Sequence, residues 1–319
     1  MAPRADQPPL RHVAERLNEH FGLYLTNCRL LAEVRSEWQH IEIFEHPQFG
    51  RVMRIDGCFM TSERDEFFYH EPMVHLPATA HAGVRDALIV GGGDGGAAAE
   101  LLKLPTMRRV VLCEIDGEVV RMARAWLPGL HRGAFDDPRL QLHLGDARVF
   151  IQTTPQRFDQ IVLDLTDPFG PAAELYTVEF YEACRRILRP GGVISLHMGS
   201  PIHLQESMGR IHASLRAVFP IVRPYLQYVP LYGTLWCMAM ASDQTDPALL
   251  SATEIDARLA ARGLGEQRLY NGAMHHALLA QPNFVREILR EHATPLHRGE
   301  HLGDVHDPAD LPPVTITTG

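Results

Sequence analysis

Two hydrophobic patterns divide the chain. Between Leu30 and Thr61, short stretches alternate apolar and polar residues, as at Ile41 and Ile43, with turn signals between them. This pattern predicts a small antiparallel β unit. From Asp86 onward, compact apolar runs alternate with longer segments of helical periodicity, which is typical of strands and helices in turn. We therefore expect an α/β fold, in which a parallel sheet carries helices on both faces.

Domain boundaries follow from these patterns. Residues 1–29 are predicted to form an N-terminal tail and lead-in, with a polar, proline-rich start. Residues 30–78 are predicted to form the N-terminal β domain with a linker helix, which we expect to end near Pro77. Residues 79–293 then form a Rossmann-like, doubly wound catalytic domain, and residues 294–319 form a C-terminal tail.

Polar residues gather where the predicted parallel strands end. The first strand leads into GGGDGG at residues 91–96, a loop that fits a nucleotide or S-adenosyl ligand and equally fits a tight structural turn. Glu114 ends the second strand, where a carboxylate can accept hydrogen bonds from both ribose hydroxyls. Asp146 ends the third and can accept one from an adenine amino group. Because such ends meet at one edge of a sheet, the acids are expected to share a crevice.

Asp94 in the glycine loop discriminates between ligands. Its carboxylate would repel the pyrophosphate of a dinucleotide and attract an ammonium or sulfonium group, which favours a cationic S-adenosyl ligand. The fourth strand ends in DLTDPFGP, where Asp164 could deprotonate an amine and Asp167 adds a second acid. The alternative for both is a turn aspartate bonded to its own backbone. Asp116, by contrast, is expected to be a solvated helix cap.

The composition limits the possible partners. Thirty Lys and Arg against 39 Asp and Glu give a net charge of −9, which argues against duplex nucleic-acid binding and suits a small cationic ligand. No apolar run is long enough to span a membrane, and the first residues lack an apolar signal core, so we expect a cytoplasmic protein with no membrane contact. The five cysteines occur singly and the C-terminal histidines lack ligand spacing, so no metal site is expected.

Motifs along most of the chain resemble those of the polyamine aminopropyltransferases, the spermidine synthase family, which is itself similar in fold to class I methyltransferases. The likeness extends over about residues 30 to 290. The motifs, in family order, are Gln39-His-Ile41, the IDG turn at Ile55, Glu63-Arg-Asp-Glu-Phe67, Tyr69-His70-Glu71, GGGDGG at 91–96, Glu114-Ile-Asp116, Gly145-Asp146, DLTDPFGP at 164–171, and Tyr270-Asn271 with His275.

The resemblance implies transfer of the aminopropyl group of decarboxylated S-adenosylmethionine to a diamine, with 5'-methylthioadenosine as the second product. The donor is a co-substrate, and no cofactor is implied. A homodimer or homotetramer is also implied. Matching positions assign Asp164 as general base; Tyr69 and Tyr232 as positioning residues for the amine; Gln39, His70, Gly91, Gly93, Asp94, Glu114, Asp146 and Ala147 to donor binding; and Asp167 and His197 to amine binding.

Three departures from the family pattern border the expected amine pocket. Met60 and His197 each replace a glutamine that many members have, and residues 230–236 differ from the usual PTYPSG-like stretch. Putrescine is the default acceptor, while cadaverine, agmatine and longer polyamines stay open. Two other functions also stay open: a putrescine N-methyltransferase using S-adenosylmethionine, and a non-catalytic polyamine-binding homologue. Asp94 argues against the methyltransferase, since it would repel the carboxylate of that donor.

Overall fold

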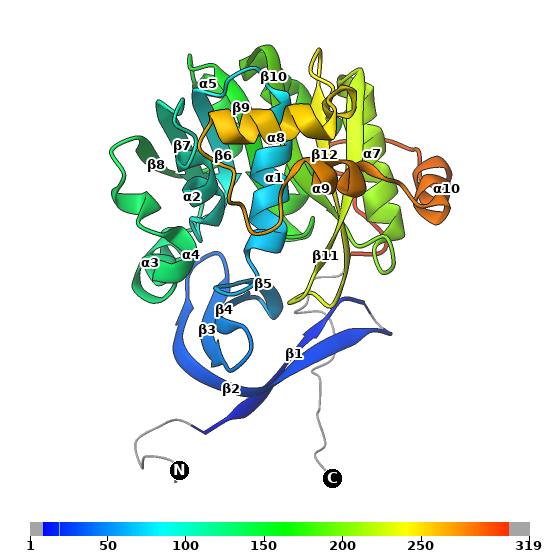
Figure 1. The fold of residues 1–319 in the computed structure, drawn as a ribbon. Helices are drawn as coiled ribbons and strands as arrows, with labels where there is room; N and C mark the ends of the chain where they lie inside the picture. Colours follow the sequence, from blue (N-terminus) through cyan, green and yellow to red (C-terminus); the bar gives the residue numbers. More distant parts are fainter. Residues whose placement is uncertain (1–8, 19, 306–319) are drawn as a thin grey trace.

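The computed structural model describes residues 9–18 and 20–305, which form two sheets joined by a long helix (Figure 1). The smaller sheet, drawn in blue, is an antiparallel meander in the order β1-β2-β3-β4-β5. Its strands are β1 (Arg11–Arg16), β2 (Gly22–Arg35), β3 (His40–His46), β4 (Gly50–Ile55) and β5 (Cys58–Ser62). The predicted N-terminal β unit is therefore present.

This sheet begins earlier in the chain than the sequence predicted. The segment assigned to the lead-in contains β1 and the first part of β2, which pair with each other. Val13 and Glu15 of β1 are both buried. A glutamate among the inward-facing positions breaks the apolar alternation that marks a strand, so the pattern did not reveal β1. Residues 1–8 of the predicted tail lie outside the described residues.

The turn between β4 and β5 has the predicted local chemistry. Ile55 pairs with Cys58, which leaves Asp56 and Gly57 as a two-residue hairpin loop. Their φ angles are 48° and 89°, the left-handed region that a type I′ hairpin requires and that Asp-Gly favours. The turn therefore fixes the register of two strands that face the central cavity described below.

Helix α1 (Phe67–Ala80) connects the two sheets. The sequence predicts an end near Pro77, but the helix continues to Ala80 and also contains Pro72. Proline removes a backbone hydrogen bond from a helix interior. Here almost every residue of the helix is buried between the sheets and their covering helices, so tertiary packing compensates for the lost bonds.

The central sheet has the order β11-β12-β10-β9-β6-β7-β8. The five strands from β10 to β8 are parallel, as predicted, while β12 and β11 add an antiparallel hairpin at one edge. The doubly wound, methyltransferase-like prediction is confirmed, with this mixed edge as an addition. The strands are β6 (Asp86–Gly91), β7 (Arg109–Glu114), β8 (Leu140–Leu144), β9 (Phe158–Asp164), β10 (Leu188–Gly199), β11 (Ile221–Val229) and β12 (Thr234–Ser242).

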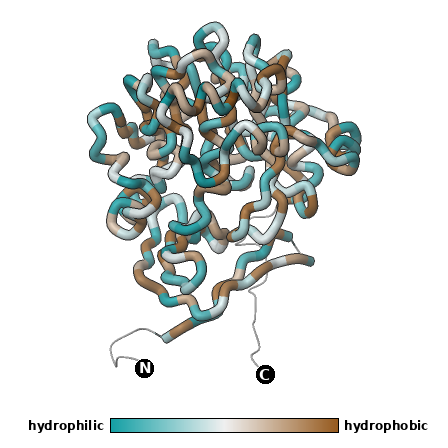
Figure 2. Tube along the Cα trace, viewed as in Figure 1, coloured by the Kyte–Doolittle hydropathy of each residue, from teal (hydrophilic) through white to brown (hydrophobic). Residues whose placement is uncertain are grey.

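Helices cover both faces of this sheet. One core joins it to α5, α6, α7 and α10, and a second joins it to α1, α2, α8 and α9. In Figure 2 hydrophobic stretches run through the interior, and many peripheral loops are hydrophilic. The helices are α2 (Gly96–Leu102), α3 (Gly117–Trp126), α4 (Pro128–His131), α5 (Ala147–Thr153), α6 (Val178–Ile187), α7 (Gln205–Val218), α8 (Ala252–Ala261), α9 (Gly272–Leu279) and α10 (Asn283–Glu291), with short turns η1 (Ala134–Asp136), η2 (Gly170–Tyr176) and η3 (Pro247–Leu249).

The first part of the predicted C-terminal tail packs against the catalytic unit. Leu296 and Leu302 are buried, and Asp304 accepts hydrogen bonds from the Ser207 backbone (3.1 Å) and hydroxyl at the start of α7. The tail boundary at residue 294 is therefore wrong for this part, because two isolated leucines gave too little periodicity to predict packing. Residues 306–319 lie outside the described range. No helix of the described residues is long and apolar enough to cross a membrane.

Candidate active site

A cavity lies between the N-terminal sheet and the carboxyl ends of β6, β7, β8 and β9. A smaller pocket adjoins it and shares part of its wall. Each residue that the sequence analysis assigned to the site lines one of the two. The larger cavity is lined by Gln39, Tyr69, His70, Gly91, Gly93, Asp94, Glu114, Asp146, Ala147, Asp164 and Tyr232. The smaller pocket is lined by Asp167 and His197, and Tyr69 and Tyr232 line both. The structure thus brings these residues together, and their individual roles stay predictions.

The glycine loop is pinned to the end of β9. The Gly92 backbone N–H donates to the Asp164 carbonyl at 2.8 Å. At Gly91, φ is 74° and an added Cβ would lie 2.3 Å from the same carbonyl oxygen, so only glycine fits. The loop therefore serves a structural purpose as well as any ligand, and it fixes Asp94 relative to Asp164.

Glu114 supports this loop from the end of β7. Its two carboxylate oxygens accept hydrogen bonds from the Gly93 N–H (3.1 Å) and the Asp116 N–H (3.0 Å). Burial raises the pKa of Glu114 to about 7, while these backbone donors oppose the shift. Each oxygen still has a free lone pair for a ribose hydroxyl. The side chain can therefore hold the loop and a nucleoside at once.

Asp116 caps α3, as predicted, but it is buried rather than solvated. Its carboxylate accepts from the Glu118 N–H (2.9 Å), from the Ser36 hydroxyl (2.7 Å) and from Gln39 Nε2 (3.0 Å). Ser36 and Gln39 belong to the N-terminal sheet region, so Asp116 ties that region to the catalytic unit. Gln39 lines the cavity because Asp116 holds it there.

Asp146 lines the cavity, but both of its carboxylate oxygens already accept hydrogen bonds from Arg148. It accepts from the Arg148 backbone N–H (2.8 Å) as the cap of α5, and the Arg148 guanidinium binds its other oxygen at 2.8 Å. This guanidinium is the main reason that the pKa of Asp146 lies below its usual range. An adenine amino group would therefore meet a carboxylate that has a partner, a feature the sequence analysis did not foresee.

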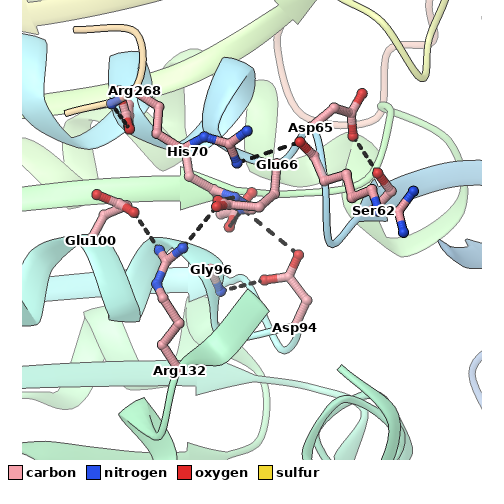
Figure 3. Close-up of polar contacts among 12 residues, drawn as sticks. Ser62, Asp65, Glu66, His70, Asp94, Gly96, Glu100, Arg132 and Arg268 are labelled. Carbon is pink, nitrogen blue, oxygen red and sulfur yellow. Dashed lines mark hydrogen bonds and ion pairs between the residues drawn. The ribbon is translucent and has the colours of Figure 1, made fainter. Parts of the chain in front are cut away.

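His70 lines the larger cavity and faces two acids, one of which, Asp94, is labelled beside it in Figure 3. Its Nε2 lies 3.7 Å from Asp94 Oδ2 and 3.8 Å from Asp164 Oδ2, while its Nδ1 lies 2.9 Å from Glu66 Oε2. The nearest ligand atoms of His70, Asp94 and Asp164 lie within 4.8 Å of one another. Such a group can surround a small cation, and the organic ammonium of the expected donor is one. That the reaction needs no metal stays a prediction.

Asp164 has the properties that a general base requires. Its side chain is only 10% exposed, and its Oδ2 has no hydrogen-bond partner among the described residues. Burial and then the negative charge of Asp94 raise the pKa of Asp164 to about 7, against the opposing charge of His70 and a hydrogen bond from Tyr69. A carboxylate with a pKa near the working pH is well matched to proton transfer.

The smaller pocket is walled by aromatic rings and contains a neutral histidine. His197 Nε2 lies 2.9 Å from the Leu165 carbonyl and 2.8 Å from the Tyr176 hydroxyl, which itself donates to the Thr166 carbonyl. A carbonyl only accepts, so Nε2 carries the proton. Burial lowers the pKa of His197 to about 4. Its Nδ1 is thus an unprotonated acceptor, 4.0 Å from Asp167 Oδ1.

Glu15 lines the same pocket and was missed by the sequence analysis. Its side chain comes from β1 and accepts a hydrogen bond from the Phe59 N–H at 2.9 Å. Burial is the largest effect on this carboxyl and raises its pKa to about 8. The one sequence signal for this position is that apolar Val13 and Leu17 stand two residues to either side of Glu15, and the structure buries all three.

Comparisons with known proteins agree with this geometry. The family model described as "Spermine/spermidine synthase domain" matches residues 66–251, and one described as "Spermidine synthase tetramerisation domain" matches residues 13–63. A relative from Nitrosomonas europaea, named polyamine aminopropyltransferase, is 63% identical over 93% of this chain and 91% of its own. The chain belongs to the spermine/spermidine synthase family. The chain is therefore an enzyme of the polyamine aminopropyltransferase type, as its motifs had indicated.

More distant members of the family agree. A polyamine aminopropyltransferase from Escherichia fergusonii is 40% identical over 86% of this chain and 96% of its own. A crystal structure of a spermidine synthase in complex with the transition-state analogue AdoDATO superposes with a TM-score of 0.83 and 33% identity. That match covers 91% of this chain and 99% of the other. The family fold therefore extends over nearly all of the described residues.

Proposed function

We propose that the protein transfers the aminopropyl group of decarboxylated S-adenosylmethionine to a diamine, with Asp164 as general base. The observation that carries the proposal is the pair of carboxylates, Asp94 and Asp164, that face His70 Nε2 in the larger cavity. Asp94 would bind the donor's ammonium group. Asp164 would take a proton from the attacking amine.

The chemistry explains why a carboxylate is needed at this point. A primary alkylamine has a pKa of roughly 10.4, so very little of it is nucleophilic at neutral pH. Asp164 removes the proton, the neutral nitrogen attacks the carbon next to the sulfonium, and the C–S bond breaks to release an uncharged thioether. Tyr69 and Tyr232, whose rings lie 6.3 Å apart, flank the path of the amine. Alignment in this enclosed site supplies much of the rate enhancement.

The smaller pocket suits the amine's second, cationic nitrogen. Asp167, the unprotonated Nδ1 of His197 and Glu15 all offer acceptors there. Putrescine is the acceptor that we propose by default. Cadaverine, agmatine and a longer polyamine are the alternatives, because His197 and Met60 alter the pocket wall.

One experiment tests the reaction. The enzyme is incubated with decarboxylated S-adenosylmethionine or S-adenosylmethionine and each of these amines, and the products are identified by mass. We expect aminopropylated product from the decarboxylated donor only. A methylated amine would instead support the N-methyltransferase, and polyamine binding without any product would support the non-catalytic homologue.

Replacing Asp94 with Asn should reduce discrimination between the two donors. The wild-type carboxylate pairs with the ammonium of decarboxylated S-adenosylmethionine and repels the carboxylate of S-adenosylmethionine, and both effects need its charge. Calorimetry with each donor measures the ratio of dissociation constants, which we expect to be large in the wild type and smaller in Asp94→Asn. Asp243→Asn, an exposed position paired with Arg185, is the control. Equal wild-type affinities would contradict the donor assignment.

We also propose that the chain forms a homo-oligomer, a dimer or a tetramer, through its N-terminal sheet. The support is the match of residues 13–63 to a domain described by tetramerisation. Sedimentation as a monomer would contradict this proposal.

A further inference from the structure

His70 is surrounded by ionisable groups from several elements. Asp94 approaches from the loop after β6, and Asp164 from the end of β9. Glu66 and Asp65 precede α1, and both interact electrostatically with His70. The Tyr69 ring lies 5.3 Å from the imidazole, edge-on to it. The side chain of His70 is only 2% exposed, so these groups replace water around it.

Glu66 is held in place by a second layer of charges. Arg132 donates to Glu66 Oε1 at 2.8 Å and also binds Glu100, and Glu100 is in turn bonded to His75 (2.7 Å) and Lys103 (2.6 Å). Glu66 Oε2 is therefore fixed where it accepts from His70 Nδ1 (Figure 3). The opposite ring nitrogen, Nε2, must face the two aspartates.

The packing leaves the imidazole no room to turn away. At Gly96, the first residue of α2, an added Cβ would lie 2.2 Å from His70 Cε1. Glycine at this position lets the ring lie against the helix start. The ring is thus confined between Gly96, Glu66 and the two aspartates, and its Nε2 points at the place proposed for the donor's ammonium.

His70 Nε2 lies 3.7 Å from Asp94 and 3.8 Å from Asp164, so a protonated His70 places a positive charge beside both aspartates. Burial alone would discharge it, but the charge of Asp94, the hydrogen bond to Glu66 and the charge of Asp164 raise the pKa of His70 to about 10. Because His70 and Asp164 interact strongly, their pKa values describe the cluster of His70, Asp94 and Asp164 as a whole rather than either residue by itself. At neutral pH the group therefore carries a proton.

The donor brings a second cation to the same place. Its ammonium would contact Asp94, on the side where His70 Nε2 already faces both acids. The ammonium and a protonated His70 would then be close together, and two positive charges repel strongly in a buried site. We propose that His70, Asp94 and Asp164 hold a proton in common in the empty enzyme, and that the donor's ammonium displaces it to solvent. The inference rests on the proposed donor.

The displacement would prepare the base. With the ammonium in place and the proton gone, Asp164 is ionised and His70 Nε2 is an acceptor for an ammonium N–H. A carboxylate able to deprotonate the amine is then present whenever the donor is bound. Donor binding and activation of the base become one event.

A comparison of two unreactive thioethers measures the effect of the ligand's ammonium group on proton release. 5'-Methylthioadenosine and 5'-S-(3-aminopropyl)thioadenosine share the nucleoside and lack the sulfonium, and they differ by the aminopropyl amine. Calorimetry at about pH 8.5 in two buffers of different protonation enthalpy counts the protons released. At that pH Glu114, whose pKa is about 7, is already ionised and contributes little to either titration. We expect about one proton released with the amino ligand and about none with 5'-methylthioadenosine.

The same linkage fixes the sign of the pH dependence. Because binding releases a proton, affinity for the amino ligand should rise with pH while the empty group is protonated. Between about pH 8 and 9 its dissociation constant should fall by up to about tenfold, while that of 5'-methylthioadenosine stays nearly constant. The rise should end as the pH nears the ligand amine's own pKa of about 10.4.

Variants locate the proton. His70→Gln should bind the amino ligand with little proton release, whereas His276→Gln, on the exposed side of α9, should release as much as the wild type. Binding of 5'-methylthioadenosine shows that each variant is folded. If the wild type binds the amino ligand but releases no more protons than it does with 5'-methylthioadenosine, the shared-proton inference is overturned and the donor assignment still stands. An amino ligand that binds no better than 5'-methylthioadenosine in the wild type would contradict the donor assignment itself.

Discussion

Replacing Asp164 with Asn should lower turnover by a factor of about 10² to 10⁴, which is the contribution expected of a positioned general base. Binding of 5'-methylthioadenosine should stay intact. The amide keeps the size of the side chain but cannot accept the proton of an alkylammonium. Among the described residues no hydrogen bond is made to Asp164 Oδ2, and the glycine loop is held by the backbone carbonyl of Asp164, so the shape of the site should persist. Product formation measured by mass, together with calorimetry, separates chemistry from binding.

The pH profile and a neighbouring variant sharpen this test. Raising the pH toward the pKa of the amine, roughly 10.4, should recover part of the lost rate, because free amine then needs no base. Asp167→Asn should mainly raise KM with a smaller loss of kcat, since charge that holds a cationic substrate acts in the ground and transition states alike. Full activity of Asp164→Asn with putrescine, cadaverine and agmatine would exclude the proposed mechanism.

Replacing Glu114 with Gln should weaken 5'-methylthioadenosine binding by about 1.5 to 3 kcal/mol, the range for losing charge-assisted hydrogen bonds. The ribose hydroxyls would lose a carboxylate acceptor, and the Gly93 N–H would lose its partner if the amide nitrogen faced it. Calorimetry measures the change. Glu118→Gln, whose side chain pairs with Arg121 on the same helix and does not line the cavity, is the matched control. An unchanged dissociation constant would show that Glu114 supports the loop without touching the nucleoside.

The raised pKa of Glu114 also predicts how the affinity for 5'-methylthioadenosine depends on pH. Its pKa is raised to about 7 by burial, so part of the empty enzyme is protonated at neutral pH and must lose a proton to accept both hydroxyls. Affinity for 5'-methylthioadenosine should therefore fall as the pH drops from about 8 to 6, and Glu114→Gln should flatten that dependence.

The sequence predicted the catalytic unit well because its strands are continuous apolar runs and its acids follow them directly. Gly91 and Asp164 are partners across β6 and β9, so proximity in the sheet follows from topology alone. The first strand was missed for the opposite reason. β1 faces the smaller pocket with Glu15, and a buried acid in an inward position conceals the hydrophobic pattern.

The pairings of the charged groups could not be predicted in the same way. The Arg148 guanidinium pairs with Asp146 two residues earlier, and Arg132 reaches Glu66 from a turn far along the chain. Such contacts depend on how helices and loops pack, which no single-residue pattern records. The sequence therefore identified Asp94, Glu114, Asp146 and Asp164 as acids of the larger cavity, but not which of them already have a charged partner.

Long-range bonds across the cavity have a consequence for folding. Asp65 accepts from the Leu231 N–H at 2.7 Å, Tyr232 donates to the Met60 carbonyl at 2.7 Å, and each bond spans more than half of the chain. Closing such large loops costs entropy before the contacts form, so they are expected to form late. A refolding chain should regain its helical circular dichroism before it can bind a nucleoside. The binding site would then be the last part of the molecule to mature, and nucleoside binding would report completed folding.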